Sequence, residues 1–213
     1  MRAVADNDVL LKGSCYGLLP VFMACVPGNG AVGILGASRF VVPKMIVRSQ
    51  LRGNPATAGD RFAAFVTENE VVEPSPDEQQ MAGLLEAAAQ RMALNLDAGE
   101  SQLVAILVSR ALPCMLTGDK RAIASLEVLF DSDARLQVIS GKLKCLEQLV
   151  SDALVTGDWD QIRRAICAEP SVDKTLSICF SCSSPGSGPA SVLEGLASYI
   201  ADLRARAARV LST

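Results

Sequence analysis

Short apolar runs alternate with longer stretches of helical periodicity along the chain. The apolar runs predict brief strands at residues 3–6, 32–35, 114–117 and 136–139. The periodic stretches predict helices at residues 9–19, 39–52, 77–96, 100–110, 120–130, 143–155 and 192–211. Loops are predicted at residues 53–60, which include Pro55, and at residues 183–189. Strands separated by helices favour a parallel sheet covered by helices, so we expect an α/β protein.

Acidic residues stand at the ends of several apolar runs. Asp6 and Asp8 follow the first run, Glu100 begins a helical stretch, and Asp119 follows a later run. The carboxyl ends of parallel strands form the rim where open α/β folds bind ligands, so these carboxylates are expected to converge. Clustered carboxylates repel one another unless a cation neutralises them. The pattern therefore predicts a Mg²⁺ or Mn²⁺ site with phosphoryl-transfer or hydrolytic chemistry.

Composition narrows the chemistry further. The 213 residues suit one sizeable core with an appendage. Histidine is absent, which excludes a Ser-His-Asp or Cys-His catalytic device and a His-ligated zinc site. The formal charge of −3 gives no overall attraction for nucleic acid, so a polyanion would need a local basic patch. Candidate patches comprise Arg39, Lys44, Arg48 and Arg52; Lys120 and Arg121; and Arg204, Arg206 and Arg209.

The seven cysteines are irregularly spaced. An odd number of cysteines without the regular spacing of a disulfide framework favours a reducing compartment, so we expect a cytoplasmic protein. No apolar run is long enough to cross a bilayer, and residues 13–35, interrupted by Pro20 and Pro27, lack the basic leader of a signal peptide. A lone C-x-x-C favours small buried cysteines over a four-thiolate zinc site built from Cys145, Cys167, Cys179 and Cys182.

Three segments of the chain form a recognisable set: D-N-D-V-L-L after the first strand, G-E-S-Q-L-V-A-I at a helix start, and L-T-G-D-K-R-A opening another helix. Together they resemble the PIN-domain family of metal-dependent nucleases. The resemblance covers residues 1–140 and implies a three-layer PIN-like domain with a central parallel sheet. A helical extension at residues 141–213 would follow it. The resemblance also implies catalytic, metal-binding carboxylates at Asp6, Glu100 and Asp119, joined at the metal by Asp8.

The resemblance implies a metal-dependent endoribonuclease that hydrolyses phosphodiester bonds in single-stranded or loop RNA. The residues that would contact this substrate are Thr117, Lys120, Arg121 and Arg39. A protein regulator such as an antitoxin is a further implied partner. The terminal helix at 192–211 would pack on the core, mediate a homodimer or present its arginines to RNA.

One feature of the family is missing from this chain. An early glutamate is expected near residues 38–46, but that segment carries Arg39 and Lys44 and no acid. Either Asp8 and Asp97 complete the metal shell, or metal binding is weak. The first alternative function is therefore a catalytically degenerate PIN-like module that binds a partner.

Three further interpretations of these residues remain possible alternatives to a nuclease site. D-N-D-V superficially matches the D-x-D signature of haloacid-dehalogenase-type phosphatases, although Leu10 stands where that signature has threonine. Asp8, Glu100 and Asp119 also suit plain helix caps, because acids are favoured in the first turn of a helix. The basic residues of 39–52 suit an ordinary solvated helix face.

Overall fold

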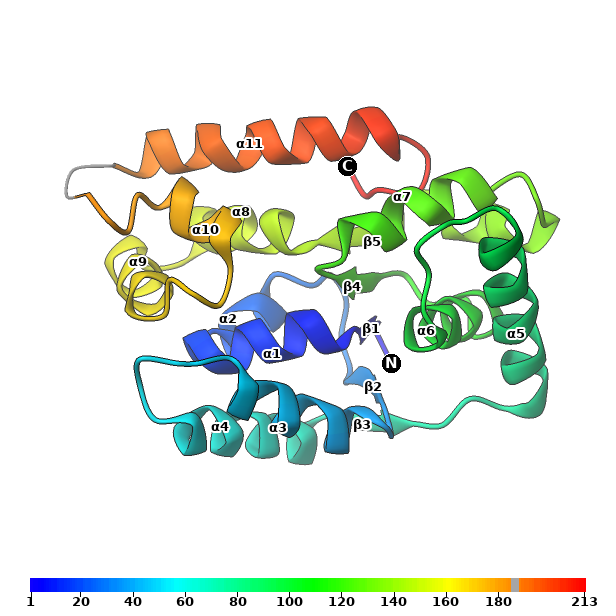
Figure 1. Cartoon of the computed structure of the whole chain (residues 1–213), viewed down its shortest axis with the longest axis horizontal. Coiled ribbons are helices and arrows are strands. Elements are labelled where there is room, and N and C mark those ends of the chain that lie inside the picture. Colours follow the sequence, from blue (N-terminus) through cyan, green and yellow to red (C-terminus); the bar gives the residue numbers. More distant parts are fainter. Residues whose placement is uncertain (185–187) are drawn as a thin grey trace.

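Five short parallel strands form one sheet at the centre of the molecule (Figure 1). The computed structural model describes residues 1–184 and 188–213. The strands are β1 (Ala3–Ala5), β2 (Val32–Leu35), β3 (Glu70–Val72), β4 (Met115–Thr117) and β5 (Leu143–Cys145). Their order is β3-β2-β1-β4-β5, and each neighbouring pair is parallel. The expectation of an α/β fold with a parallel central sheet is confirmed.

Helices cover both faces of this sheet (Figure 1). In chain order they are α1 (Asn7–Tyr16), α2 (Leu19–Ala24), α3 (Ser38–Arg48), α4 (Pro55–Glu68), α5 (Pro76–Arg91), α6 (Ala98–Ser109), α7 (Lys120–Leu129), the 3-10 helix η1 (Ala134–Ile139), α8 (Leu146–Thr156), α9 (Trp159–Ala168), α10 (Lys174–Cys179) and α11 (Pro189–Arg206).

Each face of the sheet has its own hydrophobic core. Successive strand residues point to opposite faces, so Ala3 and Ala5 pack with α1 to α4 and α8, whereas Val4 packs with α5, α6 and α7. The last long helix, α11, closes both cores, with Leu196 in the first and Leu203 in the second. Strands buried on both faces require nearly continuous apolar runs, which is why three of them were visible in the sequence.

The strand predicted at residues 136–139 is wrong, because this segment belongs to η1. Leu136 and Ile139 lie three residues apart and are both fully buried, while Val138 between them is 40% exposed. Residues three apart project on the same side of a 3-10 turn, so the segment buries two side chains without being extended. The fifth strand is β5, where the sequence predicted the start of a helix.

Helix boundaries also differ from the expected ones. Residues 53–60 were expected as a loop but begin α4: the side chain of Asn54 accepts a hydrogen bond from the Ala56 N–H at 2.9 Å, and Pro55 takes the first helical position. The helix expected at 9–19 ends at Tyr16, because Gly17 adopts a left-handed conformation with φ of 68°. The stretch at 77–96 stops being helical after Arg91.

The segment expected as a separate helical extension is part of the same sheet. It contributes β5, which pairs with β4, and Leu211 forms a further parallel bridge with Leu143. A boundary at residue 140 would therefore divide the sheet between two domains. The physical reason is that without β5 the edge of β4 would be open, and both cores would lose buried residues such as Leu149 and Leu203.

The cysteines correct one expectation. Cys167 and Cys182 form a disulfide that joins α9 to the chain after α10, whereas small unpaired cysteines were expected throughout. Cys145 and Cys179 are buried thiols. Part of the loop expected at residues 183–189 lies outside the described residues. Among the helices of the described residues, none combines the length and apolarity needed to span a bilayer.

Candidate active site

The candidate site lies where the strand order reverses, between β1 and β4. The chain leaves β1 at Asp6 and leaves β4 at Thr117, and the Asp6 N–H donates to the Leu116 carbonyl at 2.9 Å. The two strand ends are thus held side by side by a continuation of the sheet. Open α/β sheets place ligands outside the carboxyl ends of the strands at such a reversal. Asp6 and Asp119 are therefore brought together, as predicted.

Asp6 occupies the N-cap position of α1 without capping it. An N-cap carboxylate usually accepts hydrogen bonds from the first amides of its helix, but the Asp6 side chain accepts none from them. Its Oδ2 instead accepts a hydrogen bond from the Thr117 hydroxyl at 3.0 Å, across the two strands. Burial, followed by the nearby charges of Asp8 and Asp97, raises the pKa of Asp6 to about 6, although the Thr117 hydrogen bond opposes this rise.

Glu100 caps a helix, which confirms the helix-cap alternative for this residue. It sits at the third position of α6, where its Oε2 accepts from the Asp97 N–H at 2.9 Å and the Asp97 Oδ1 accepts from the Glu100 N–H at 2.8 Å. Only 6% of the residue is exposed. Burial raises the pKa of Glu100 to about 8, and the charges of Asp97, Asp6 and Asp119 add to the effect.

Glu78 offers an internal comparison, since it holds the same position in a capping box at the start of α5. Its two carboxylate oxygens each accept a hydrogen bond from Arg110 at 2.8 Å. Arg110 lowers the pKa of Glu78 below its usual value despite burial. The capping box alone therefore does not set the pKa of Glu100, whose burial is not offset by a guanidinium as that of Glu78 is.

Asp119 is the N-cap of α7, and its side chain caps this helix, as the helix-cap alternative predicted. Its Oδ1 accepts from the Arg121 N–H at 2.7 Å, and its Oδ2 pairs with the Arg121 guanidinium at 2.8 Å. Burial opposes ionisation, but the hydrogen bonds and charge of Arg121 outweigh it and lower the pKa of Asp119. This carboxylate stays ionised at neutral pH, beside an arginine side chain that is 72% exposed.

Asp8 belongs to an ion-pair chain that the sequence did not reveal. Lys12, one turn later on α1, lies 2.6 Å from Asp8 and 2.7 Å from Asp173. Although burial disfavours the charged ammonium, the two carboxylates raise the pKa of Lys12 to about 12. The Asp8–Lys12 spacing of four residues was a usable signal, whereas Asp173 lies in the distant segment before α10 and carried none.

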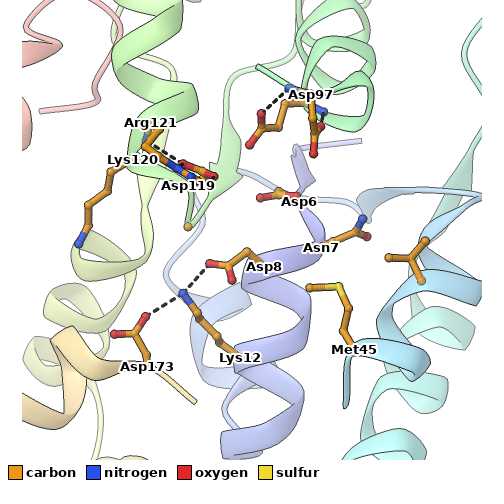
Figure 2. A pocket seen from close by; sticks show the side chains of 13 residues that line it. Asp6, Asn7, Asp8, Lys12, Met45, Asp97, Asp119, Lys120, Arg121 and Asp173 are labelled. Atoms are coloured by element: carbon orange, nitrogen blue, oxygen red, sulfur yellow. Dashed lines mark hydrogen bonds and ion pairs between the residues drawn. The ribbon is translucent and has the colours of Figure 1, made fainter. Parts of the chain in front are cut away.

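These groups share one cavity of about 590 Å³. Figure 2 shows carboxylates entering it from the ends of β1 and β4, from the start of α6 and from Asp173. Its charged lining comprises six carboxylates, Asp6, Asp8, Asp97, Glu100, Asp119 and Asp173, against the three basic residues Lys12, Lys120 and Arg121. Throughout residues 1–184 and 188–213, Asp6, Asp97 and Glu100 have no ion-pair partner, so their negative charge is uncompensated when they ionise.

The chemical groups that line the cavity suit a hard divalent cation. Every acidic donor is an oxygen, which is the ligand type of Mg²⁺ and Mn²⁺. The Oδ1 of Asn7 adds a buried acceptor that lacks a hydrogen-bond partner within the described part of the chain. In the present side-chain positions, the described residues contain no group of three or more acidic or cysteine side chains spaced to hold a metal. Coordination would therefore require side chains such as Glu100 to rotate.

The four expected substrate residues occupy different environments. Thr117 is fully buried and is not part of the cavity lining; its hydroxyl accepts the Asp119 N–H at 3.1 Å and so links the side chain of Asp6 to the backbone of Asp119. Lys120 lines the cavity but pairs with the buried Glu147. Arg121 lines the cavity beside Asp119. Arg39 lies on the exposed surface of α3 and is not part of the cavity lining.

The wall where a further acid was expected is apolar. Val41 and Met45, both from α3, line the cavity on that side. Met45 points toward the residues of α1 (Figure 2). Asp97 and Glu100 border a second, adjoining cavity of about 320 Å³ with Asn95 and Arg121. No residue of α3 that lines the cavity therefore supplies the missing early acid, whereas Asp8 and Asp97 both belong to the lining.

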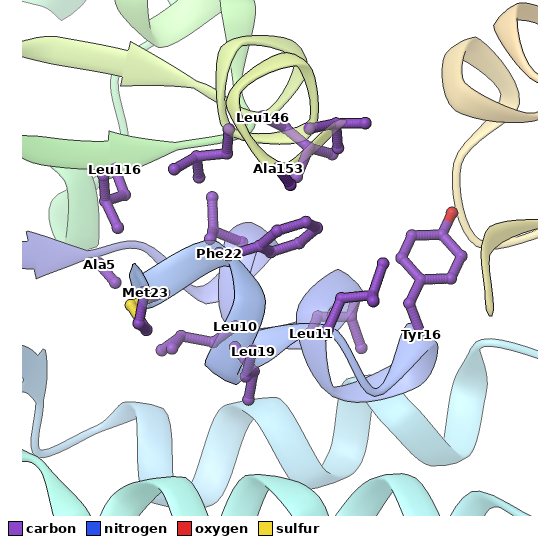
Figure 3. Packing of buried hydrophobic residues seen from close by; sticks show 14 of the residues in the cluster. Ala5, Leu10, Leu11, Tyr16, Leu19, Phe22, Met23, Leu116, Leu146 and Ala153 are labelled. Carbon is purple, nitrogen blue, oxygen red and sulfur yellow. The ribbon is translucent and has the colours of Figure 1, made fainter. Parts of the chain in front are cut away.

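The helix that carries Asp8 and Lys12 is firmly anchored. On its core side, Leu10 is fully buried and packs in the cluster that includes Phe22 of α2 and Leu146 of α8 (Figure 3). This packing sets the direction of the polar side of α1 toward the cavity. Leu10, which replaces the threonine of the phosphatase signature, is consequently a core residue.

Comparison with protein-family models, with curated proteins and with solved structures finds no match to this chain. The functional conclusion therefore rests on the chemistry of the cavity.

Proposed function

We propose that the protein is a Mg²⁺- or Mn²⁺-dependent nuclease that hydrolyses phosphodiester bonds in single-stranded RNA. The observation that carries this proposal is the pair of buried carboxylates, Asp6 and Glu100, that lack cationic partners at the strand reversal. A buried acid without a partner destabilises the fold when it ionises. Such an arrangement is typical of a site that binds a cation.

Asp6, Glu100 and Asp119 would hold the metal, with Asp8, Asp97 and Asn7 within the same lining. A bound divalent cation would supply Lewis-acid stabilisation of a phosphate and a water of lowered pKa. Thr117 keeps Asp6 directed across the strand ends through its hydrogen bond. Glu100, with a pKa of about 8, holds a proton at neutral pH and must release it before it can act as a ligand.

The basic residues of the cavity supply the complement for a phosphate. Arg121 has a mostly exposed guanidinium next to Asp119, so it can contact a phosphate without losing its ion pair entirely. Lys120 lies 5.1 Å from the centroid of the Tyr199 ring and is held by Glu147. These positive groups line the same cavity as the unpaired carboxylates, an arrangement that suits a phosphate bound to a metal ion.

A second candidate is a non-catalytic module that binds RNA or another partner through the same surface. The observation in its favour is the apolar wall of Val41 and Met45, which leaves one side of the cavity without a ligand oxygen. The two functions share metal binding but differ in turnover.

The test combines cleavage with metal binding. Labelled single-stranded RNA and DNA of mixed sequence are incubated with Mn²⁺ or EDTA, and Mn²⁺ affinity is measured by calorimetry. We expect Mn²⁺-dependent RNA cleavage that falls by about 100-fold or more in Asp6→Asn and Glu100→Gln, because even loss of an outer-shell partner costs about 10- to 100-fold. Asp60→Asn, at an exposed position of α4, is the matched control and should retain activity.

Each outcome separates the candidates. Equal cleavage by the wild type and Asp6→Asn would rule out the proposed site. Tight Mn²⁺ binding without cleavage would favour the non-catalytic module. Comparable cleavage of DNA would contradict the assignment of RNA as the substrate.

A further inference from the structure

The outer face of α3 combines exposed basic and apolar side chains next to the cavity. Arg39, Lys44 and Arg48 are exposed on it, and Phe40 and Val47 are 67% and 73% exposed. The helix contains no acidic residue. Large exposed apolar side chains that gather on one surface commonly mark a binding site, so we expect this face of α3 to bind a partner.

The spacing of these residues orders them around the helix. Val41 and Met45 line the cavity, and Lys44 and Arg48 each follow one of them by three residues. Residues three or four apart are neighbours on a helix surface, so Lys44 and Arg48 lie beside the cavity wall. Phe40 is four residues before Lys44 and thus lies next to it, farther from the cavity. The face is therefore a continuous path that begins at the candidate site.

The charges of this face are uncompensated. Lys12, Lys120, Arg110 and Arg121 all form ion pairs, whereas Arg39, Lys44 and Arg48 form none with any described residue. These three positive charges lie on one helix without an acidic residue, in a chain whose formal charge is −3. They favour a polyanion and disfavour a second copy of the same face, because two such faces would repel each other.

The exposed aromatic ring of Phe40 indicates which kind of polyanion this face would bind. The Arg39 Cζ lies 6.0 Å from the centroid of the Phe40 ring, so a charge and an aromatic surface are presented together. Single-stranded nucleic acids are bound by basic grooves with aromatic side chains on which bases stack, whereas bases in a duplex are already stacked.

We infer that the outer face of α3 binds the stretch of single-stranded RNA adjoining the phosphate in the cavity. Arg39, Lys44 and Arg48 contact its phosphates, and Phe40 stacks on one base. The identity of the nucleic acid rests on the proposed function. The position of the strand rests on the continuity of this face with Val41 and Met45.

The test measures binding without cleavage. A fluorescein-labelled, single-stranded RNA of about 12 nucleotides, within the usual range of binding-site sizes, is titrated in EDTA and followed by anisotropy. Arg39→Gln, Lys44→Gln and Arg48→Gln are combined in one variant. The matched control combines Arg91→Gln, Lys142→Gln and Arg164→Gln, which remove three basic residues with no ion pair in the described structure and away from α3.

We expect the α3 variant to bind about 10-fold or more weakly at low salt. Each lost phosphate contact on a single strand reduces the slope of log K against log salt by about 0.7, so three should reduce it by about 2. Phe40→Ala should weaken binding by about 5- to 150-fold, the range for one stacked base, whereas Val47→Ala should not weaken it. Equal losses in the α3 variant and its control would overturn the inference.

Other outcomes separate this inference from the proposed function. If the wild type binds RNA through α3 but does not cleave it with Mn²⁺, the inference stands and the nuclease proposal fails. If Asp6→Asn abolishes cleavage while the α3 variant binds and cleaves like wild type, the nuclease proposal stands and the inference fails. A Phe40→Ala variant that changes the sedimenting mass and not the RNA affinity would identify α3 as a contact between copies of the chain and refute RNA binding there.

Discussion

Replacing Glu100 by glutamine should stabilise the protein at alkaline pH. The amide keeps an oxygen that can accept the Asp97 N–H, so the capping box is preserved. It removes a charge that is 6% exposed and faces Asp6, Asp97 and Asp119 without a cationic partner in the described structure. Sites built for ligand binding often carry this kind of instability.

The magnitude follows from the pKa of Glu100, which rises from 4.5 to about 8 on folding. At about 1.4 kcal/mol per pKa unit, this corresponds to roughly 5 kcal/mol. Because the folded pKa is raised, the folded chain binds more protons than the unfolded one between these values, and stability is lost as pH rises through that window. The open cavity lets water and side chains relax, so we expect a gain of about 2–4 kcal/mol for Glu100→Gln near pH 8.5 and less than about 1 kcal/mol near pH 5.

The assay is urea unfolding in EDTA at both pH values, followed by circular dichroism. Glu78→Gln is the matched control, since Glu78 holds the same capping position but is paired with Arg110. That variant should lose about 1–3 kcal/mol at both pH values, because it leaves a partly buried guanidinium without its carboxylate. The reasoning is refuted if Glu100→Gln lowers the free energy of unfolding near pH 8.5, or shifts it equally at both pH values.

Three further outcomes are expected. Thr117→Val, which deletes the hydroxyl bonded to Asp6, should cost about 1–3 kcal/mol in urea unfolding and move the pH dependence of Mn²⁺ binding upward, while Thr117→Ser should match wild type. Lys12→Met leaves two facing carboxylates unpaired and should cost about 2–4 kcal/mol near pH 7; a loss that persists near pH 3, where those acids are neutral, would contradict this cause. Reduction of the Cys167–Cys182 disulfide should cost about 3 kcal/mol for its loop of 15 residues, seen as a lower Tm with reductant in wild type but not in a double serine variant.

The strand ends were accessible from the sequence because their signals are local. Three of the strands are buried on both faces, and their uninterrupted apolar residues stand out from the surrounding helical periodicity. Asp6 and Asp119 follow two of these runs, so parallel strands place both at the same edge of the sheet. They come close because β1 and β4 are neighbours, which the strand order decides. The remaining strands, β3 and β5, each include a charged residue, Glu70 or Lys144, so neither appears as an uninterrupted apolar run.

Cap and ligand roles could not be separated from sequence. Asp6, Asp119 and Glu100 all begin helices, yet Asp6 caps nothing, Asp119 caps and pairs with Arg121, and Glu100 caps without a cation. Glu78 has the same local pattern as Glu100 and the opposite electrostatics. Local sequence specifies the backbone position of each acid but not which charged group lies opposite it.

The sequence alone determined an α/β chain with carboxylates at the carboxyl ends of its strands. It could do so because the signals for strands and for helix starts come from residues that are close together in the chain. Only the tertiary structure decided which carboxylates remain without a partner. Lys12 joins Asp8 to Asp173 across more than 160 positions, and no lysine or arginine reaches Asp6 or Glu100 within the described residues. Charge compensation depends on distance in space and on burial, and both are set by packing between segments that are remote in the chain.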